Sequence, residues 1–197
     1  MSGDIEARTA AEGTVVRYQV DPTMSRFTIK VSASGLLAGI GHNPTIAIRD
    51  FAGEASFVPE SLDGASLRVT VKPDSFQVTD DVNEHDKVDI ENRMKQDVLE
   101  TGRYREIAFE SSSIELKKLG NSYFVANISG RLTLHGVTRE LPIVCQVAVN
   151  GDTLRGYGEL SVRQTDFGIR LVSVAGGTLK VKDEVKCSFD LVARKQG

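Results

Sequence analysis

Residues 122–149, SYFVANISGRLTLHGVTRELPIVCQVAV, contain two runs in which apolar and polar side chains alternate. Apolar residues occupy even-numbered positions in the first run and odd-numbered positions in the second, and the polar segment 135–140 separates the runs. Alternation with a period of two is typical of a strand with one buried face. A short connection that contains glycine is typical of a hairpin. The segment therefore predicts a long antiparallel hairpin with one apolar wall and one polar wall.

Shorter alternating runs occur on both sides of this hairpin. Residues 16–20 and 27–31 alternate on either side of a turn signal at Asp21-Pro22, and together they predict a first hairpin. Further alternating runs predict additional strands, and they lie at 67–71, 154–162 and 185–193.

Two segments change the parity of their apolar positions. Residues 45–58 resemble one long strand, but the apolar positions shift by one near 49–51, which predicts a bulge or a bend there. A second shift predicts a bulge around residues 111–113. Kinks of this kind are expected in a sheet that curls towards closure.

One segment has helical spacing. Between about residues 83 and 99, Ile90, Met94 and Val98 recur every four residues and form a narrow apolar stripe. Asn83 is the expected N-cap and Gly102 the expected C-terminal stop. We predict one α-helix that packs against the outside of the body.

About eight sequential strands and one helix predict an all-β fold. The long strands and their kinks favour an antiparallel, up-and-down, lipocalin-like β-barrel over a sandwich. Residues 1–13 are small and polar and are expected to form a disordered tail. Residues 14–197 are expected to form a single barrel domain, because no linker or repeat divides them.

The composition excludes several functions. A net charge of −3 argues against a nucleic-acid partner, which requires a dense basic face. No apolar run is long enough to span a membrane. The sequence starts without the pattern of a signal peptide, so we expect a cytoplasmic protein, or a periplasmic one if an export signal has been trimmed.

Few residues have the spacing that metal or covalent chemistry requires. The three histidines form no metal-ligand set, and we expect no metal and no cofactor. Cys145 and Cys187 are in phase with apolar neighbours, so buried free thiols are favoured over a disulfide.

The interior of a barrel of this size is either filled by side chains or holds a small ligand. The inward positions are rich in Ile, Val, Leu, Ala and Gly, and a cavity lined by them suits an apolar ligand. A filled barrel that serves as an interaction module is one alternative. A small-molecule enzyme that uses His135 or Asp166 as acid or base is another.

Several stretches, taken in order, resemble the YceI-like family of lipocalin-like polyisoprenoid-binding proteins. The resemblance covers about residues 18–193. Its most specific parts are GRLTLHGVTR at 130–139 and Arg163 followed by Asp166-Phe167-Gly168-Ile169. It implies an extended barrel with a flanking helix and a pore that holds an isoprenoid or other amphiphilic lipid. It implies no catalytic residue, and because some members form dimers, a homodimer is one expectation.

We therefore predict non-enzymatic binding or transport of a polyisoprenoid, an isoprenoid quinone or a fatty-acid type of lipid. The residues expected to line the lumen are Phe27, Ile29, Val31, Ile46, Ile48, Val69, Phe109, Ile128, Leu132, Ile143 and Phe189. The residues expected at a flap or mouth are Leu36, Leu37, Ile40 and Met94.

Overall fold

The computed structural model describes residues 13–34, 43–59, 62, 64–80, 83–174 and 179–197. Most of them belong to antiparallel strands, and the main-sheet strands are β1 (Val16–Val20), β2 (Arg26–Lys30), β4 (Thr45–Ile48), β5 (Phe51–Phe57), β6 (Ser66–Val71), β7 (Phe76–Val78), β8 (Ile107–Lys118), β9 (Tyr123–Leu134), β10 (Val137–Asn150), β11 (Thr153–Arg163) and β14 (Glu184–Lys195).

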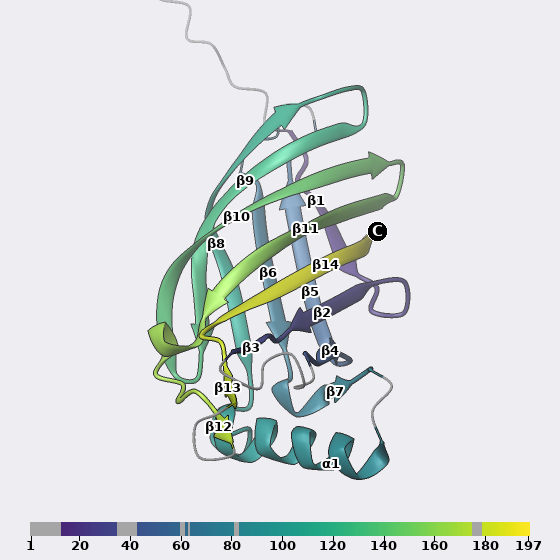
Figure 1. Cartoon of the computed structure of the whole chain (residues 1–197). Helices are drawn as coiled ribbons and strands as arrows, with labels where there is room; N and C mark the ends of the chain where they lie inside the picture. Colours follow the sequence, from purple (N-terminus) through teal and green to yellow (C-terminus); the bar gives the residue numbers. More distant parts are fainter. Residues whose placement is uncertain (1–12, 35–42, 60–61, 63, 81–82, 175–178) are drawn as a thin grey trace, which may run out of the picture.

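These strands form a closed antiparallel barrel with eight strand positions, as the sequence predicts (Figure 1). Closure is made by β14, which pairs with β11 on one side and with β1 and β2 on the other. A small separate sheet of β3 (Ala33–Ser34), β12 (Ser173–Val174) and β13 (Leu179–Val181) lies near the helix.

The predicted first hairpin is wrong, because β1 and β2 follow one another along β14 instead of pairing with each other. Val20 pairs with Ala193 and Arg26 pairs with Asp190, so residues 21–25 bulge out opposite only two residues of β14. Ser25 fixes this excursion: its hydroxyl donates to the Asp21 carbonyl (2.7 Å) and accepts from the Val192 amide (2.9 Å). The turn signal was correct, but the chain keeps its direction after it.

The predicted long strand at 45–58 is two strands. The break at 49–50 lies where the parity shift predicted a bend, but β4 pairs with β2 and β7, whereas β5 pairs with β1 and β6. The neighbouring position breaks as well, because the 3₁₀ turn η1 (Pro73–Ser75) separates β6 from β7. Three adjacent positions of the barrel are therefore each filled by two short strands placed end to end.

The hairpin at 122–149 is confirmed. β9 and β10 pair from Leu134 opposite Val137 to Tyr123 opposite Ala148. The two turn residues, His135 and Gly136, have φ of 52° and 75°, as a tight hairpin turn that follows the strand twist requires. The predicted bulge in β8 is also confirmed, between Ser111 and Ser113.

The helix begins and extends as predicted. α1 (Glu84–Arg93) starts at Asn83, whose side chain accepts a hydrogen bond from the Asp86 amide (2.9 Å). A wider π-helical turn, η2 (Met94–Val98), continues it. The predicted stop at Gly102 is wrong: the chain turns out of the helix at Glu100, which has a φ of 45°. The amide of Thr101 already bonds back to the Lys95 carbonyl (2.9 Å), so the helix has ended before Gly102.

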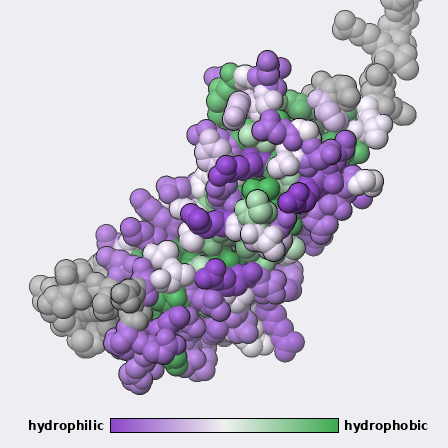
Figure 2. Space-filling model, turned by 90° about the vertical axis from the view of Figure 1, so that its right-hand side faces the viewer, coloured by the Kyte–Doolittle hydropathy of each residue, from purple (hydrophilic) through white to green (hydrophobic). Residues whose placement is uncertain are grey.

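The helix lies across one end of the barrel (Figure 1). We call this the helix end, and we call the opposite end, where β8 turns into β9, the hairpin end. The side of the molecule that faces the viewer in Figure 2 is mainly hydrophilic, with hydrophobic residues only in small groups. Within the described ranges, no helix combines the length and the apolar character that crossing a bilayer requires.

Candidate ligand-binding cavity

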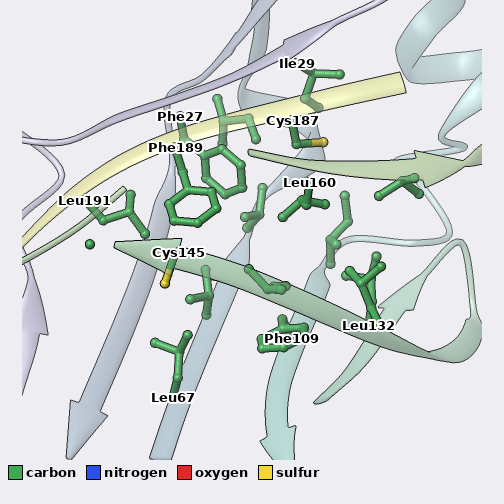
Figure 3. Close-up of a pocket in the computed structure, with 18 of the residues that line it drawn as sticks. Phe27, Ile29, Leu67, Phe109, Leu132, Cys145, Leu160, Cys187, Phe189 and Leu191 are labelled. Carbon is green, nitrogen blue, oxygen red and sulfur yellow. The ribbon is translucent and has the colours of Figure 1, made fainter. Parts of the chain in front are cut away.

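The barrel encloses a cavity of about 970 Å³. Inward-facing side chains from all eight strand positions line it, and in Figure 3 aromatic, aliphatic and thiol groups converge on the space from opposite walls. Pockets for small ligands commonly measure roughly 300–1,000 Å³, so this cavity is at the upper end of that range. The barrel is therefore not filled by its own side chains, which argues against the filled-barrel alternative.

Most of the residues that the sequence predicted for the ligand site lie on the cavity wall. They come from the strands β2, β4, β6, β8, β9, β10 and β14, from η2 and from the segment after β2, and they are Phe27, Ile29, Val31, Ile46, Ile48, Val69, Met94, Phe109, Ile128, Leu132, Ile143 and Phe189. Leu36, Leu37 and Ile40 lie outside the described residues. A role of any of these side chains in ligand binding stays a prediction.

Other lining residues were missed, although the signal for them was present in the sequence. Those on β10 and β14 share the parity of the predicted positions on these strands, and they are Leu141, Cys145, Val147, Cys187 and Leu191. Leu160 lies on β11, in the alternating run at 154–162, where no lining residue was predicted. Gly156 of β11 also lines the cavity, and a Cβ added there would meet no atom within 4 Å. The wall is therefore open at this glycine.

Polar groups on the cavity wall gather at its two ends. At the helix end they come from α1, β13, η3 and the segment after β2, and they are Asp86, Asp89, Arg93, Lys180, Gln164 and Ser32. At the hairpin end they come from β1, β5, β6 and β14 and from the turn between β8 and β9, and they are Tyr18, Ser56, Ser66, Asn121 and Lys195. A ligand inside would meet apolar side chains along the middle of the barrel and polar groups at its tips.

Gln164, a buried polar residue, belongs to the 3₁₀ turn η3 (Gln164–Phe167) that follows β11. Its side-chain amide donates to the Lys182 carbonyl (2.9 Å). Asp183 holds the same turn, because its carboxylate accepts from the amide (2.8 Å) and the hydroxyl (2.7 Å) of Thr165. These bonds, with Arg163 as a further contributor, hold the pKa of Asp183 below its usual value.

The middle of the cavity contains two thiols, Cys145 and Cys187, which are free and buried as the sequence predicted. Burial away from water raises the pKa of Cys145 to about 11 and that of Cys187 to about 12. Both groups are therefore neutral at physiological pH. A neutral thiol is a weak nucleophile, so these cysteines act as small apolar wall residues.

His135 and Asp166, the acid–base candidates of the enzyme alternative, are not among the lining residues. The His135 side chain is 11% exposed, and its Nε2 lies 3.1 Å from the Glu100 carboxylate. Its ring packs on Tyr104, with centroids 4.3 Å apart. His135 thus joins the hairpin turn to the segment after the helix. Asp166 is exposed in η3, and its backbone carbonyl accepts from Arg139 (3.1 Å).

The fold and the cavity define a class: small closed antiparallel barrels with an apolar interior, of the lipocalin-like kind. The particular family follows from the sequence, because residues 18–193 match the model of the YceI-like domain. The chain belongs to the YceI-like family.

Relatives and solved structures are similar over most of their length. A UPF0312 protein of Shewanella oneidensis is 31% identical over 150 residues, which is 73% of this chain and 71% of the relative. Burkholderia cenocepacia BcnA has a TM-score of 0.67 at 21% identity and covers 88% of this chain and 98% of its own. A polyisoprenoid-binding domain from Saccharophagus degradans has a TM-score of 0.65 at 15% identity and covers 91% and 98%. At these identities the two structures support the fold alone.

Proposed function

We propose that this protein binds an elongated apolar or amphiphilic lipid in the barrel cavity, as a carrier or sensor and without converting it. The observation that carries the proposal is the cavity of about 970 Å³ whose middle section is lined by apolar groups and whose polar groups lie at the ends. A polyisoprenoid, an isoprenoid quinone or a fatty acid has the matching chemistry. The Saccharophagus degradans domain, described as polyisoprenoid-binding, supports this ligand class by analogy.

The energetics favour such a ligand. Burial of roughly 400 Å² of apolar ligand surface, at about 25 cal/mol per Å², gives about 10 kcal/mol before the costs of association are subtracted. The absence of a conversion step is supported by the groups that line the middle of the cavity. The titratable ones there are two thiols whose raised pKa values keep them protonated.

Gly156→Phe is the sharpest test of the cavity. The new ring starts from a position where a Cβ has open space, so it should project into the lumen without disturbing the wall. We expect the variant to fold and to lose at least about tenfold in affinity for a fluorescent polyene fatty acid, measured by titration, with a farnesyl-type alcohol as competitor. Native mass spectrometry of the gently purified wild type should show a co-purified lipid.

Two matched variants make the result interpretable. Gly156→Ala adds only a methyl group at the same place and should bind as the wild type does. Ser161→Leu adds an apolar side chain to an exposed position of the same strand and should also leave binding unchanged. If Gly156→Phe melts like the wild type and binds the probe equally well, the lumen is not the binding site.

A further inference from the structure

The turn between β8 and β9 borders the cavity mouth at the hairpin end. Asn121 in this turn and Phe124 at the start of β9 both line the cavity. Figure 1 shows the turn at the end of the barrel away from α1, standing out beyond the turn between β10 and β11. The turn is therefore one part of the rim at this end of the cavity.

The turn has a fixed backbone. The amides of Leu119 and Gly120 both donate to the Tyr123 carbonyl, at 2.8 and 3.2 Å. The Ser122 carbonyl accepts from the amide of Val149 in β10 (2.9 Å). Because only main-chain atoms make these bonds, the side chains of Leu119 and Tyr123 can be replaced without removing them.

Apolar side chains point into solvent at this fixed turn. Leu119 is 60% exposed and Tyr123 57%. Val15, which directly precedes β1 at the same end of the barrel, is 55% exposed. A single exposed apolar residue is ordinary, but Leu119 and Tyr123 lie side by side, joined by the bond from the Leu119 amide to the Tyr123 carbonyl, and grouped apolar side chains are more typical of a surface that meets an apolar phase.

Cations flank these apolar groups. Lys117 and Lys118 directly precede Leu119, are exposed, and have no ion-pair partner among the described residues. Lys195 lines the mouth itself. Carboxylates of Asp152 and Glu115 also lie towards this end, so the lysines are only partly offset. The whole chain has a net charge of −3, whereas Lys117 and Lys118 place two positive charges next to each other before this turn.

We propose that this protein docks on an anionic lipid bilayer through Leu119 and Tyr123 of the β8–β9 turn, with Lys117 and Lys118 at the headgroups, so that lipid enters the cavity through the adjacent mouth. Leucine and tyrosine side chains suit the boundary between acyl chains and headgroups, and lysines beside them can extend their ammonium groups to anionic phosphates. The route keeps the lipid chain out of water during transfer. Docking on a bilayer would deliver lipid to the cavity, so this proposal rests on the lipid-binding function proposed above.

Co-sedimentation with lipid vesicles tests the docking surface. We expect the wild type to bind vesicles that contain phosphatidylglycerol, to bind vesicles of phosphatidylcholine alone much more weakly, and to lose binding as salt increases. Lys117→Gln with Lys118→Gln should lower the partition coefficient about tenfold, since each lysine near an anionic surface contributes a several-fold factor. Leu119→Ser with Tyr123→Ser should lower it by a similar factor on both vesicle types.

Matched controls lie on the side of the barrel. Val144→Ser removes an apolar side chain that is 59% exposed on β10, and Lys30→Gln with Lys186→Gln removes two exposed lysines that face each other across β2 and β14. Both should partition as the wild type does. If the turn variants also partition as the wild type does, or if the wild type ignores anionic vesicles, the docking proposal is overturned and the apolar turn is left for a protein partner.

Binding of the fluorescent fatty acid in solution, without vesicles, separates this proposal from the previous one. The turn variants should retain that binding. Vesicle binding by a wild type that takes up no fatty acid or isoprenoid would contradict the lipid-binding function and leave the docking surface standing.

Discussion

Gly130 shows how a single residue sets the shape of the cavity wall. It lies on β9 opposite Leu141 of β10, among inward-facing residues, and a Cβ there would collide with the Phe109 ring and come within 2.6 Å of the Glu110 carbonyl. The Phe109 ring occupies the space that a side chain at position 130 would fill. Phe109 in turn lines the cavity, so the glycine fixes where this wall residue stands.

Gly130→Ala should therefore destabilise the barrel by about 1–3 kcal/mol, the usual range for overpacking a well-packed site. Urea unfolding of the wild type and the variant would measure the change in the free energy of unfolding. Gly156→Ala is the matched control, because its Cβ has open space and it removes conformational freedom from the unfolded chain. Equal stabilities for Gly130→Ala and the wild type would show that the ring has room to move aside.

At this scale, parity alone placed the predicted and described lining residues on the cavity wall, although many further lining residues were not predicted. Ile143 and Cys145 are both inward on β10, and the alternation that identified the first applied equally to the second. The contributions of glycines could not be predicted in the same way. The space beside Gly130 is taken by a neighbouring side chain, whereas the space beside Gly156 is open. This difference depends on contacts between strands that are distant in the sequence.

Among the elements, the short turn η3 contributes to the cavity wall and is held mainly by bonds to residues 182 and 183, of which the Asp183 side chain makes two. The Asp183 carboxylate accepts both the amide and the hydroxyl of Thr165 and also faces Arg163 Nε at 3.3 Å. The turn places Gln164 on the cavity wall and buries Phe167 in the core.

Asp183→Ala should lower the melting temperature and loosen this part of the wall, because Thr165 loses both acceptors. Hydrogen–deuterium exchange should become faster at the amides of residues 164–169 while the β9–β10 hairpin stays protected. Asp190→Ala removes a comparable exposed partner of Arg155 on the barrel side and serves as the control. Unchanged exchange at 164–169 in Asp183→Ala would mean that packing of Phe167 alone holds the turn.

Local elements followed from the sequence where they depend on neighbouring residues. The Asn83 cap, the β8 bulge and the tight turn at His135-Gly136 were all encoded within a few positions. The pairing of β1 and β2 was not, because the turn at 21–25 does not show whether the chain reverses or continues. The ladders that β1 and β2 form with β14, together with the bonds between Ser25 and Val192, decide that outcome, and both involve residues far away in the sequence.

For the whole molecule, stability should fall at both extremes of pH. On the alkaline side the thiols are responsible: their folded pKa values, about 11 and 12, exceed the ordinary value of 9.0 because the thiolate would be buried. Their contribution is complete below pH 9 and is lost as the pH rises towards the folded values, since the unfolded chain then releases protons more readily. Chemical unfolding at pH 8 and pH 10.5 would measure the loss, and Cys187→Ala should reduce it.

On the acid side three carboxylates act in the same direction. The pKa values of Asp21, Asp183 and Asp190 are lowered, chiefly by hydrogen bonds from Thr23, Thr165 and Arg155 respectively. Their contribution is present above the ordinary carboxyl value of 3.8 and is lost as the pH falls below it. The same unfolding series, extended to pH 3, should show the decline, and a flat profile between pH 5 and pH 3 would contradict these assignments.

The position of β14 affects how the chain must fold. This strand, near the end of the chain, pairs with β1 and β2 near its beginning, and until it docks the cylinder has a gap along its full height. On a ribosome, residues 16–163 would emerge as a curved, open sheet whose apolar concave face meets water. Such long-range pairing is slow, in the range of milliseconds to seconds, and leaves unpaired edges exposed meanwhile. Chaperones that cover these edges and the open face would therefore matter most in the interval before β14 docks.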